Sequence, residues 1–184
     1  MGKVAEQLSI NPLDPAIMEI LTFETYQPLL NRFLSLLKEE MGERLVGVVL
    51  YGSLARNQVK HDSDVDLLVV GKGSKEDVEG GYRRARDALE GTSEYRALVK
   101  QGIWPSISPF IVTEEYLRQS TPWLFLEIQD HGLILYDPEG FLAWKIERVR
   151  ERMRELGTKK VMLPDGSWYW DVKPNWKPGE VFEL

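Results

Sequence analysis

The stretch VVLYGSLARNQVKHDSDVDLLVV, residues 48–70, decides the fold because it sets two apolar, β-branched runs on either side of a polar loop. Short runs of this kind, bounded by Gly and Asp, are typical of strands that are covered on both faces. We therefore expect strands over residues 45–51 and 65–70. The loop contains Gly-Ser, and the second run starts with Asp-Val-Asp. Two carboxylates at the start of a buried strand need a physical reason.

Composition limits the kinds of site and partner that the chain can have. Its 184 residues fit one domain, or one domain with a small appendage. The formal net charge of −6 argues against a surface built to hold nucleic acid, since phosphate binding rests on Lys and Arg. There is no cysteine, so the available metal ligands are carboxylates, two histidines and backbone groups, an inventory that suits hard cations such as Mg²⁺. No segment approaches the roughly 20 apolar residues that span a bilayer, and we expect a cytoplasmic protein.

Hydrophobic periodicity predicts helices around further strands. Apolar residues recur at helical spacing from residue 15 to 41, where Pro28 predicts a break between two helical pieces. The charged segment 74–101 predicts helix with ill-defined boundaries. The later elements are expected in this order: a strand at 106–112, a short helix capped by Thr113, a helix at 123–129, a strand at 132–136, and a helix from Asp137 to about Leu156.

The C-terminal part carries two surfaces with more than one interpretation. The helix expected over 138–156 has an apolar stripe and, on its other side, a row of cations: Lys145, Arg148, Arg152 and Arg154. Interleaved glutamates favour a solvated face over a phosphate-binding one. The tail from Gly166 is aromatic and Pro-rich, and its Trp side chains either dock on the body, which we favour, or stack on a base or a partner.

Asp64 and Asp66 form a candidate metal site. Side chains alternate between the faces of a strand, so both carboxylates project from one face, about 7 Å apart along the chain. Close carboxylates repel one another, and a divalent cation is the ordinary way to relieve that repulsion. The structural alternative is a polar strand end in which Asp62, Ser63 and Asp64 act as turn and capping groups.

The Gly52-Ser53 pair adds weight to the metal interpretation. It directly follows a buried strand and opens a short helix expected over 54–57. Such a turn brings backbone N–H groups and a hydroxyl to the same end of the sheet as the carboxylates. Amides that bind phosphate, beside acids that bind Mg²⁺, describe a site for a nucleoside triphosphate. Taken alone, Gly52 fits a tight strand-to-helix turn, and Ser53 fits an N-cap.

The string YGSLARNQVKHDSDVDLL, residues 51–68, resembles the signature of the DNA polymerase β-like nucleotidyltransferase superfamily: a hydrophobic residue, Gly-Ser, some ten residues, then Asp-hydrophobic-Asp. More narrowly, it is similar to small prokaryotic and archaeal members of the minimal or kanamycin-nucleotidyltransferase type. The resemblance implies an α+β fold with a small mixed sheet of about four to five strands flanked by helices. It implies a nucleotidyltransferase domain over 1–137, with an N-terminal helical segment. Residues 138–184, most of which lie outside the family's shared core, are expected to be a C-terminal helix and an aromatic, Pro-rich tail packed on that domain.

The resemblance also implies an activity. A nucleoside monophosphate, most plausibly AMP, would pass from a triphosphate to a hydroxyl on a small molecule or a protein, with Mg²⁺ or Mn²⁺ bound and pyrophosphate leaving. Gly52 and Ser53 would bind the nucleotide through its β- and γ-phosphates. Asp64 and Asp66 would be the catalytic metal ligands. Arg56 could reach a phosphate, although an exposed Arg needs no such role.

The chain departs from the family pattern in two places. Asn57 stands where the family often has Gly, which alters the turn. Active members also carry a third carboxylate on a later strand, but the strand expected here offers Ser106 and Ser108 and no acid. Glu114 and Glu115 fall past its end. Without that acid, proton transfer from the acceptor is poorly supported, and the chain would bind a nucleotide better than it transfers one.

Two functions of other classes stay open beside the enzyme. One is a nucleotide-binding regulatory or antitoxin-like module, paired with a helical partner protein, that has weak or no transfer activity. The other, template-independent addition to nucleic acid ends, is disfavoured by the net negative charge. Neither His61 nor His131 is assigned a role, and His131 is expected at a helix C-terminus.

Overall fold

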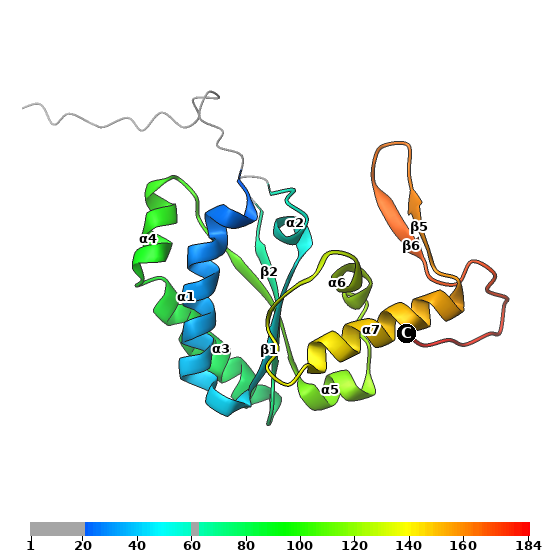
Figure 1. Cartoon of the computed structure of the whole chain (residues 1–184), viewed down its shortest axis with the longest axis horizontal. Coiled ribbons are helices and arrows are strands. Elements are labelled where there is room, and N and C mark those ends of the chain that lie inside the picture. Colours follow the sequence, from blue (N-terminus) through cyan, green and yellow to red (C-terminus); the bar gives the residue numbers. More distant parts are fainter. Residues whose placement is uncertain (1–20, 60–62) are drawn as a thin grey trace, which may run out of the picture.

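The computed structural model describes residues 21–59 and 63–184, and its centre is a four-stranded mixed sheet in the order β3-β2-β1-β4 (Figure 1). The strands are β1 (Leu45–Tyr51), β2 (Val65–Gly71), β3 (Ile107–Thr113) and β4 (Leu133–Tyr136). β1 pairs antiparallel with β2 and with β4, whereas β2 and β3 run parallel. The expected α+β class and mixed sheet are confirmed.

Helices cover both faces of this sheet (Figure 1). One layer consists of α1 (Phe23–Met41), α3 (Lys75–Leu89) and α4 (Ser93–Lys100), and the other of α5 (Glu114–Gln119), α6 (Phe125–His131) and α7 (Phe141–Leu156). Strand residues alternate between the two cores, so that Leu50 and Leu67 pack in the first and Val49 and Leu68 in the second. This burial on both faces explains the continuous apolar runs of β1 and β2. Within the described ranges, no helix is long and apolar enough to cross a membrane.

α1 runs through Pro28 without a break, so the expected interruption was wrong. Pro28 lies early in the helix and removes a single backbone hydrogen bond there. The apolar face of α1 is buried in the first core on both sides of Pro28, where three side chains are each 1% exposed: Tyr26, Leu29 and Phe33. Tertiary packing of this kind supplies most of the stability of a helix, and here it outweighs the lost bond. The part of the predicted segment before residue 21 lies outside the described residues.

Capping residues set the ends of the next helices. The segment expected to be one loosely defined helix is divided into α3 and α4, because the hydroxyl of Thr92 accepts a hydrogen bond from the N–H of Tyr95 (3.2 Å) and starts α4 there. α5 begins after Thr113, as predicted, and the Thr113 hydroxyl accepts a hydrogen bond from the N–H of Tyr116 (3.1 Å).

α7 begins at Phe141, three residues later than Pro138 predicted. The Asp137 carboxylate is still its capping group. It accepts hydrogen bonds from the N–H groups of Leu142 (3.2 Å) and Ala143 (2.8 Å), which lie in the first turn of the helix.

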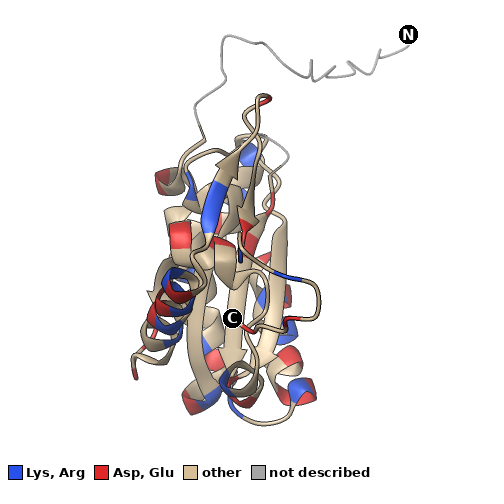
Figure 2. Ribbon diagram, turned by 90° about the vertical axis from the view of Figure 1, so that its right-hand side faces the viewer, with Lys and Arg blue, Asp and Glu red and all other residues tan. Residues whose placement is uncertain are grey.

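The charged side of α7 is laced with ion pairs. Arg148 pairs with Glu151 and Arg152 with Glu155, both at 2.9 Å, which supports the solvated interpretation of this face. Charges of both signs are interspersed over the helices and are absent from most of the central strands (Figure 2). Lys145, expected on the same charged side, is instead buried and only 7% exposed.

A two-stranded hairpin that was not expected from the sequence follows α7. It consists of β5 (Lys159–Met162) and β6 (Trp168–Asp171) and extends away from the end of α7 (Figure 1). The tail then returns along the helix, where Arg152 Nε donates a hydrogen bond to the Glu183 carbonyl oxygen (2.8 Å). Phe182 packs against the second core. The C-terminal segment therefore packs against α7.

Candidate active site

Gly52 brings the backbone directly against the carboxylate of Asp66. It opens the short helix α2 (Gly52–Ala55) after β1, with φ of +73°, a region that L side chains rarely adopt. A Cβ added at this position would lie 2.0 Å from Asp66 Oδ2. Only glycine fits both the conformation and the space. Asn57, with φ of +54°, closes the same turn in a conformation that Asn tolerates better than most residues, so the departure from the family's Gly keeps the turn.

Asp64 and Asp66 lie together at the start of β2. Asp66 is the second residue of the strand and is partly buried, whereas Asp64 directly precedes the strand and is exposed. Burial raises the pKa of Asp66, and the negative charge of Asp64 raises it further. Both effects disfavour a second negative charge at this point. The site is therefore arranged to attract a cation.

Tyr51 and Ser108 flank Asp66 on the two neighbouring strands. Tyr51 is opposite Asp66 on β1, and Ser108 is opposite it on β3. Hydrogen bonding from Ser108 favours the charged form of Asp66 and so lowers its pKa, but burial outweighs it. Burial, followed by the charge of Asp66, raises the pKa of the Tyr51 hydroxyl. Ser108 thus stands on the later strand beside the Asp pair, where the resemblance calls for a third carboxylate.

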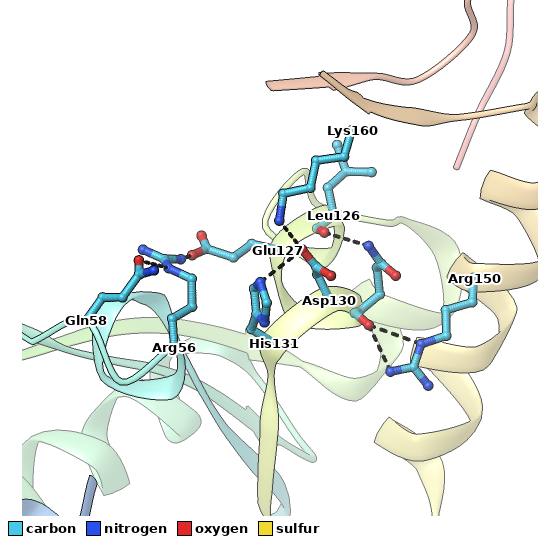
Figure 3. A network of polar contacts seen from close by, with 9 residues as sticks. Arg56, Gln58, Leu126, Glu127, Asp130, His131, Arg150 and Lys160 are labelled. Carbon is cyan, nitrogen blue, oxygen red and sulfur yellow. Dashed lines mark hydrogen bonds and ion pairs between the residues drawn. The ribbon is translucent and has the colours of Figure 1, made fainter. Parts of the chain in front are cut away.

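Arg56 is close enough to Asp66 to favour its charged form, yet its guanidinium is already engaged (Figure 3). Arg56 forms an ion pair with Glu127 of α6, and its Nε donates a hydrogen bond to Gln58 Oε1 (3.4 Å). The side chains of Arg56 and Glu127 are 21% and 29% exposed. A phosphate contact by Arg56 stays a prediction, because it would compete with Glu127 for the guanidinium.

Beyond Glu127, α6 presents a second polar cluster (Figure 3). Asp130 Oδ2 accepts from Lys160 Nζ of the hairpin (2.6 Å) and lies 3.1 Å from His131 Nε2. His131 is in the last turn of α6, as expected from its place before Gly132. The hairpin is therefore tied to the helix that carries the partner of Arg56.

The Asp pair has the chemistry to hold Mg²⁺. Desolvation and the neighbouring charge destabilise the ionised Asp66, and a divalent cation would offset both effects. Mg²⁺ in nucleotide sites is usually held by one or two carboxylates together with phosphate and water oxygens. In the part of the chain that the structure describes, no group of three or more acidic, His or Cys side chains is placed to hold a metal. An ion at Asp64 and Asp66 would take its remaining ligands from the nucleotide and water.

Comparison with known families identifies the kind of domain that contains the Gly-Ser turn and the Asp pair. Residues 30–120 match the sequence model described as "Nucleotidyltransferase domain". The chain carries a nucleotidyltransferase domain. The matched segment runs from within α1 to the end of α5 and contains the Gly-Ser turn, the Asp pair and the strand that bears Ser108.

Two relatives of the chain come from Methanocaldococcus jannaschii. The candidate protein adenylyltransferase MJ1305 is 29% identical over 145 residues, which cover 78% of this chain and 92% of the relative. The candidate protein adenylyltransferase MJ0604 is 28% identical over 108 residues, 58% of this chain and 94% of the relative. Both relatives are spanned almost entirely.

Solved structures that are similar to the nucleotidyltransferase share less sequence. The toxin-antitoxin MntA-HepT complex contributes a chain that is 17% identical, with a TM-score of 0.41, over 71% of this chain and 92% of that one. The spectinomycin adenyltransferase AAD(9) from Enterococcus faecialis, solved with ATP and spectinomycin, is 15% identical with a TM-score of 0.44, over 74% of this chain and 67% of that one.

Sequence reasoning missed Tyr51 and Glu127, and it named Ser108 on the later strand without placing it opposite Asp66. Tyr51 could have been found, because it ends the first strand beside Gly52 and a hairpin-like pairing places it opposite Asp66. The place of Ser108 depends on the register of a parallel pair separated by two helices. Nothing in the sequence places Glu127 next to Arg56. Asp62 and His61 lie outside the described residues.

Proposed function

We propose that this nucleotidyltransferase transfers AMP from ATP to a hydroxyl group and releases pyrophosphate. The observation that carries the proposal is the contact between Gly52 and Asp66, in which a Cβ would come within 2.0 Å of the carboxylate. It joins the backbone N–H groups of a phosphate-binding turn to the acids that bind a metal. A nucleoside triphosphate with its metal needs both at one point. The names of the two archaeal relatives support adenine as the base.

The turn residues, the two acids and Arg56 have different roles in this proposal. Gly52 and Ser53 bind the β- and γ-phosphates through backbone N–H groups and the serine hydroxyl. Asp64 and Asp66 hold Mg²⁺ or Mn²⁺, which when bound neutralises charge on the phosphates. Arg56 adds a positive charge beside Asp66, and Glu127 fixes its direction. Catalysis then rests on positioning and charge, as is typical of phosphoryl transfer.

The reaction forms a bond from the acceptor oxygen to the α-phosphorus and breaks the bond from that phosphorus to pyrophosphate. The hydroxyl proton must leave at the same time. Ser108 is a poor base in the position beside Asp66, so the proton passes to water or to a group that the acceptor brings. We therefore expect tight nucleotide binding and slow transfer in the absence of the right acceptor.

We propose a protein as the acceptor. The support is the similarity to two candidate protein adenylyltransferases, one of which is matched over 78% of this chain. We also propose that residues 138–184 are an addition packed on the nucleotidyltransferase domain of residues 1–137.

The test uses ATP labelled on the α-phosphate. The purified chain is incubated with this ATP, Mg²⁺ and a mixture of proteins, and label on protein and released pyrophosphate are both measured. Asp64→Asn and Asp66→Asn should abolish both signals. The control Asp87→Asn removes an exposed carboxylate of α3 and should keep them. Label that persists in Asp66→Asn would contradict the proposed site. Metal-dependent ATP binding without any transfer would point to a regulatory module.

A further inference from the structure

Lys145 is a buried lysine without a partner among the described residues. Only 7% of it is exposed, on a helix whose arginines are paired with glutamates. Burial lowers the pKa of its ammonium, and within residues 21–59 and 63–184 no hydrogen bond, ion pair or ring contact compensates. Buried lysines are rare and are normally paired, because removing an ammonium from water without a compensating partner is strongly unfavourable. An unpaired one therefore needs an explanation.

A cavity of about 390 Å³ lies beside Lys145. We call it the α7 cavity. Its walls come from the end of α5 and the connection to α6, from α7 and from the C-terminal tail, with these residues among its lining: Arg118, Ser120, Thr121, Trp123 and Phe182. The tail wall is fixed, since Arg152 holds the Glu183 carbonyl (2.8 Å) and Phe182 packs against the second core. A volume of this size falls within the range of small-molecule sites.

The lining of the α7 cavity has the chemistry of an oxyanion site. Two cations, Lys145 and Arg118, meet the hydroxyls of Ser120 and Thr121 there. Arg118 is held in place by Glu114, whose carboxylate accepts from its Nε (2.9 Å), and by the ring of Phe141 4.8 Å away. Charged and hydroxyl donors of this kind bind phosphate and carboxylate groups.

Two further lining residues limit what else the ligand contains. Trp123 is 67% exposed and offers an indole surface for an apolar or planar portion. Glu183 is exposed at the tail wall and opposes a second negative charge on that side. A small molecule with one anionic end fits this lining better than a polyanion.

We propose that the α7 cavity binds a small molecule through an oxyanion, a phosphate or carboxylate group, that pairs with the Lys145 ammonium. No residue of the Gly-Ser turn or of the Asp pair lines this cavity, and Trp123, Lys145 and the tail lie outside the segment that matches the nucleotidyltransferase family. The proposal therefore stands or falls independently of the proposed transfer reaction.

Calorimetry with the full chain tests the binding. Inorganic phosphate, AMP and benzoate are titrated separately, each at constant ionic strength, into the wild type, Lys145→Met and the control Lys75→Met. Lys75 is exposed (67%) on α3 and lies outside the cavity. We expect the wild type and Lys75→Met to bind at least one of the anions equally well and Lys145→Met to bind it at least tenfold more weakly. The titration that gives heat separates a phosphate ligand from a carboxylate ligand.

A thermal-unfolding series tests the same binding by a measurement that does not depend on the heat released in the calorimeter. Without added anion, Lys145→Met should melt at the same or a higher temperature than the wild type, because methionine fills the space without an unpaired charge. The anion that binds should raise the melting temperature of the wild type and of Lys75→Met but not that of Lys145→Met. Absence of binding by the wild type at millimolar concentrations, or an equal loss in both lysine variants, would overturn the proposal.

Discussion

Replacing Gly52 by alanine tests the contact on which the nucleotidyltransferase site rests. Two effects follow from the structure. An L residue at φ of +73° costs about 1–2 kcal/mol of folding free energy. The new Cβ would also lie 2.0 Å from Asp66 Oδ2, so the carboxylate has to move by about 1 Å or more. A displacement of that size at a catalytic group costs on the order of 100-fold in rate, or about 2.7 kcal/mol at the transition state.

Gly157→Ala separates these two effects. Gly157 has φ of +70° and nothing within 4 Å of an added Cβ, so alanine there has the backbone strain without the collision. Urea unfolding should show a loss of about 1–2 kcal/mol in Gly157→Ala and at least as large a loss in Gly52→Ala. Transfer of labelled AMP in the presence of Mg²⁺ should fall about 100-fold only in Gly52→Ala. Equal activity of the two variants would refute the role of Gly52 beside Asp66.

Three further changes test the packing and capping of the fold. Tyr82→Phe should leave stability at neutral pH unchanged or about 1 kcal/mol higher, since the buried hydroxyl has no hydrogen-bond partner in the described chain. Burial raises the pKa of Tyr82 to about 12, so the unfolded chain ionises first; between pH 10 and pH 12 this residue should cost the wild type about 2 kcal/mol of stability, which the variant should not lose in pH-dependent urea melts. Asp137→Ala removes the acceptor for two N–H groups at the start of α7 and should cost about 1 kcal/mol in urea unfolding, with part of it restored in Asp137→Asn. Leu37→Ala, at a position with 0% exposure, should cost about 2–5 kcal/mol and lower the midpoint in scanning calorimetry; a change below 1 kcal/mol would contradict the packing of α1.

The central strands could be predicted because their physics is local. A strand buried on both faces must be apolar at every position, and β1 and β2 show this pattern without interruption. The capping role of Thr113 was equally visible, since a hydroxyl that accepts the N–H of Tyr116 needs only three residues of chain.

Features that depend on distant parts of the chain were beyond the sequence pattern. The break expected at Pro28 fails because the first core holds both sides of the helix. Lys145 belongs to a charged row by its neighbours, yet it is buried and lines the α7 cavity together with residues of the tail. The hairpin of β5 and β6 is a different case, because the Pro-Asp-Gly turn between its strands is a local signal that the tail's aromatic composition obscured.

The candidate site also combines contacts that follow from the local sequence with contacts that depend on distant segments. Motif spacing suffices to expect Gly52 near Asp66, since both flank one loop between neighbouring strands. The pairing of Asp66 with Ser108 and of Arg56 with Glu127 joins segments that are far apart in the chain, and only the tertiary structure supplies them. The roles of the individual site residues in catalysis and metal binding stay predictions.

Calorimetric titration of ATP in the presence and absence of Mg²⁺ tests the proposed site most directly. The wild type and the Asp64→Asn/Asp66→Asn double variant are compared at the same ionic strength, after circular dichroism has shown that both are folded. We predict ATP binding by the wild type that requires Mg²⁺ and is lost in the double variant. Binding that is equal in the two proteins, or that does not depend on the metal, would contradict a nucleotide site built on Gly52, Asp64 and Asp66.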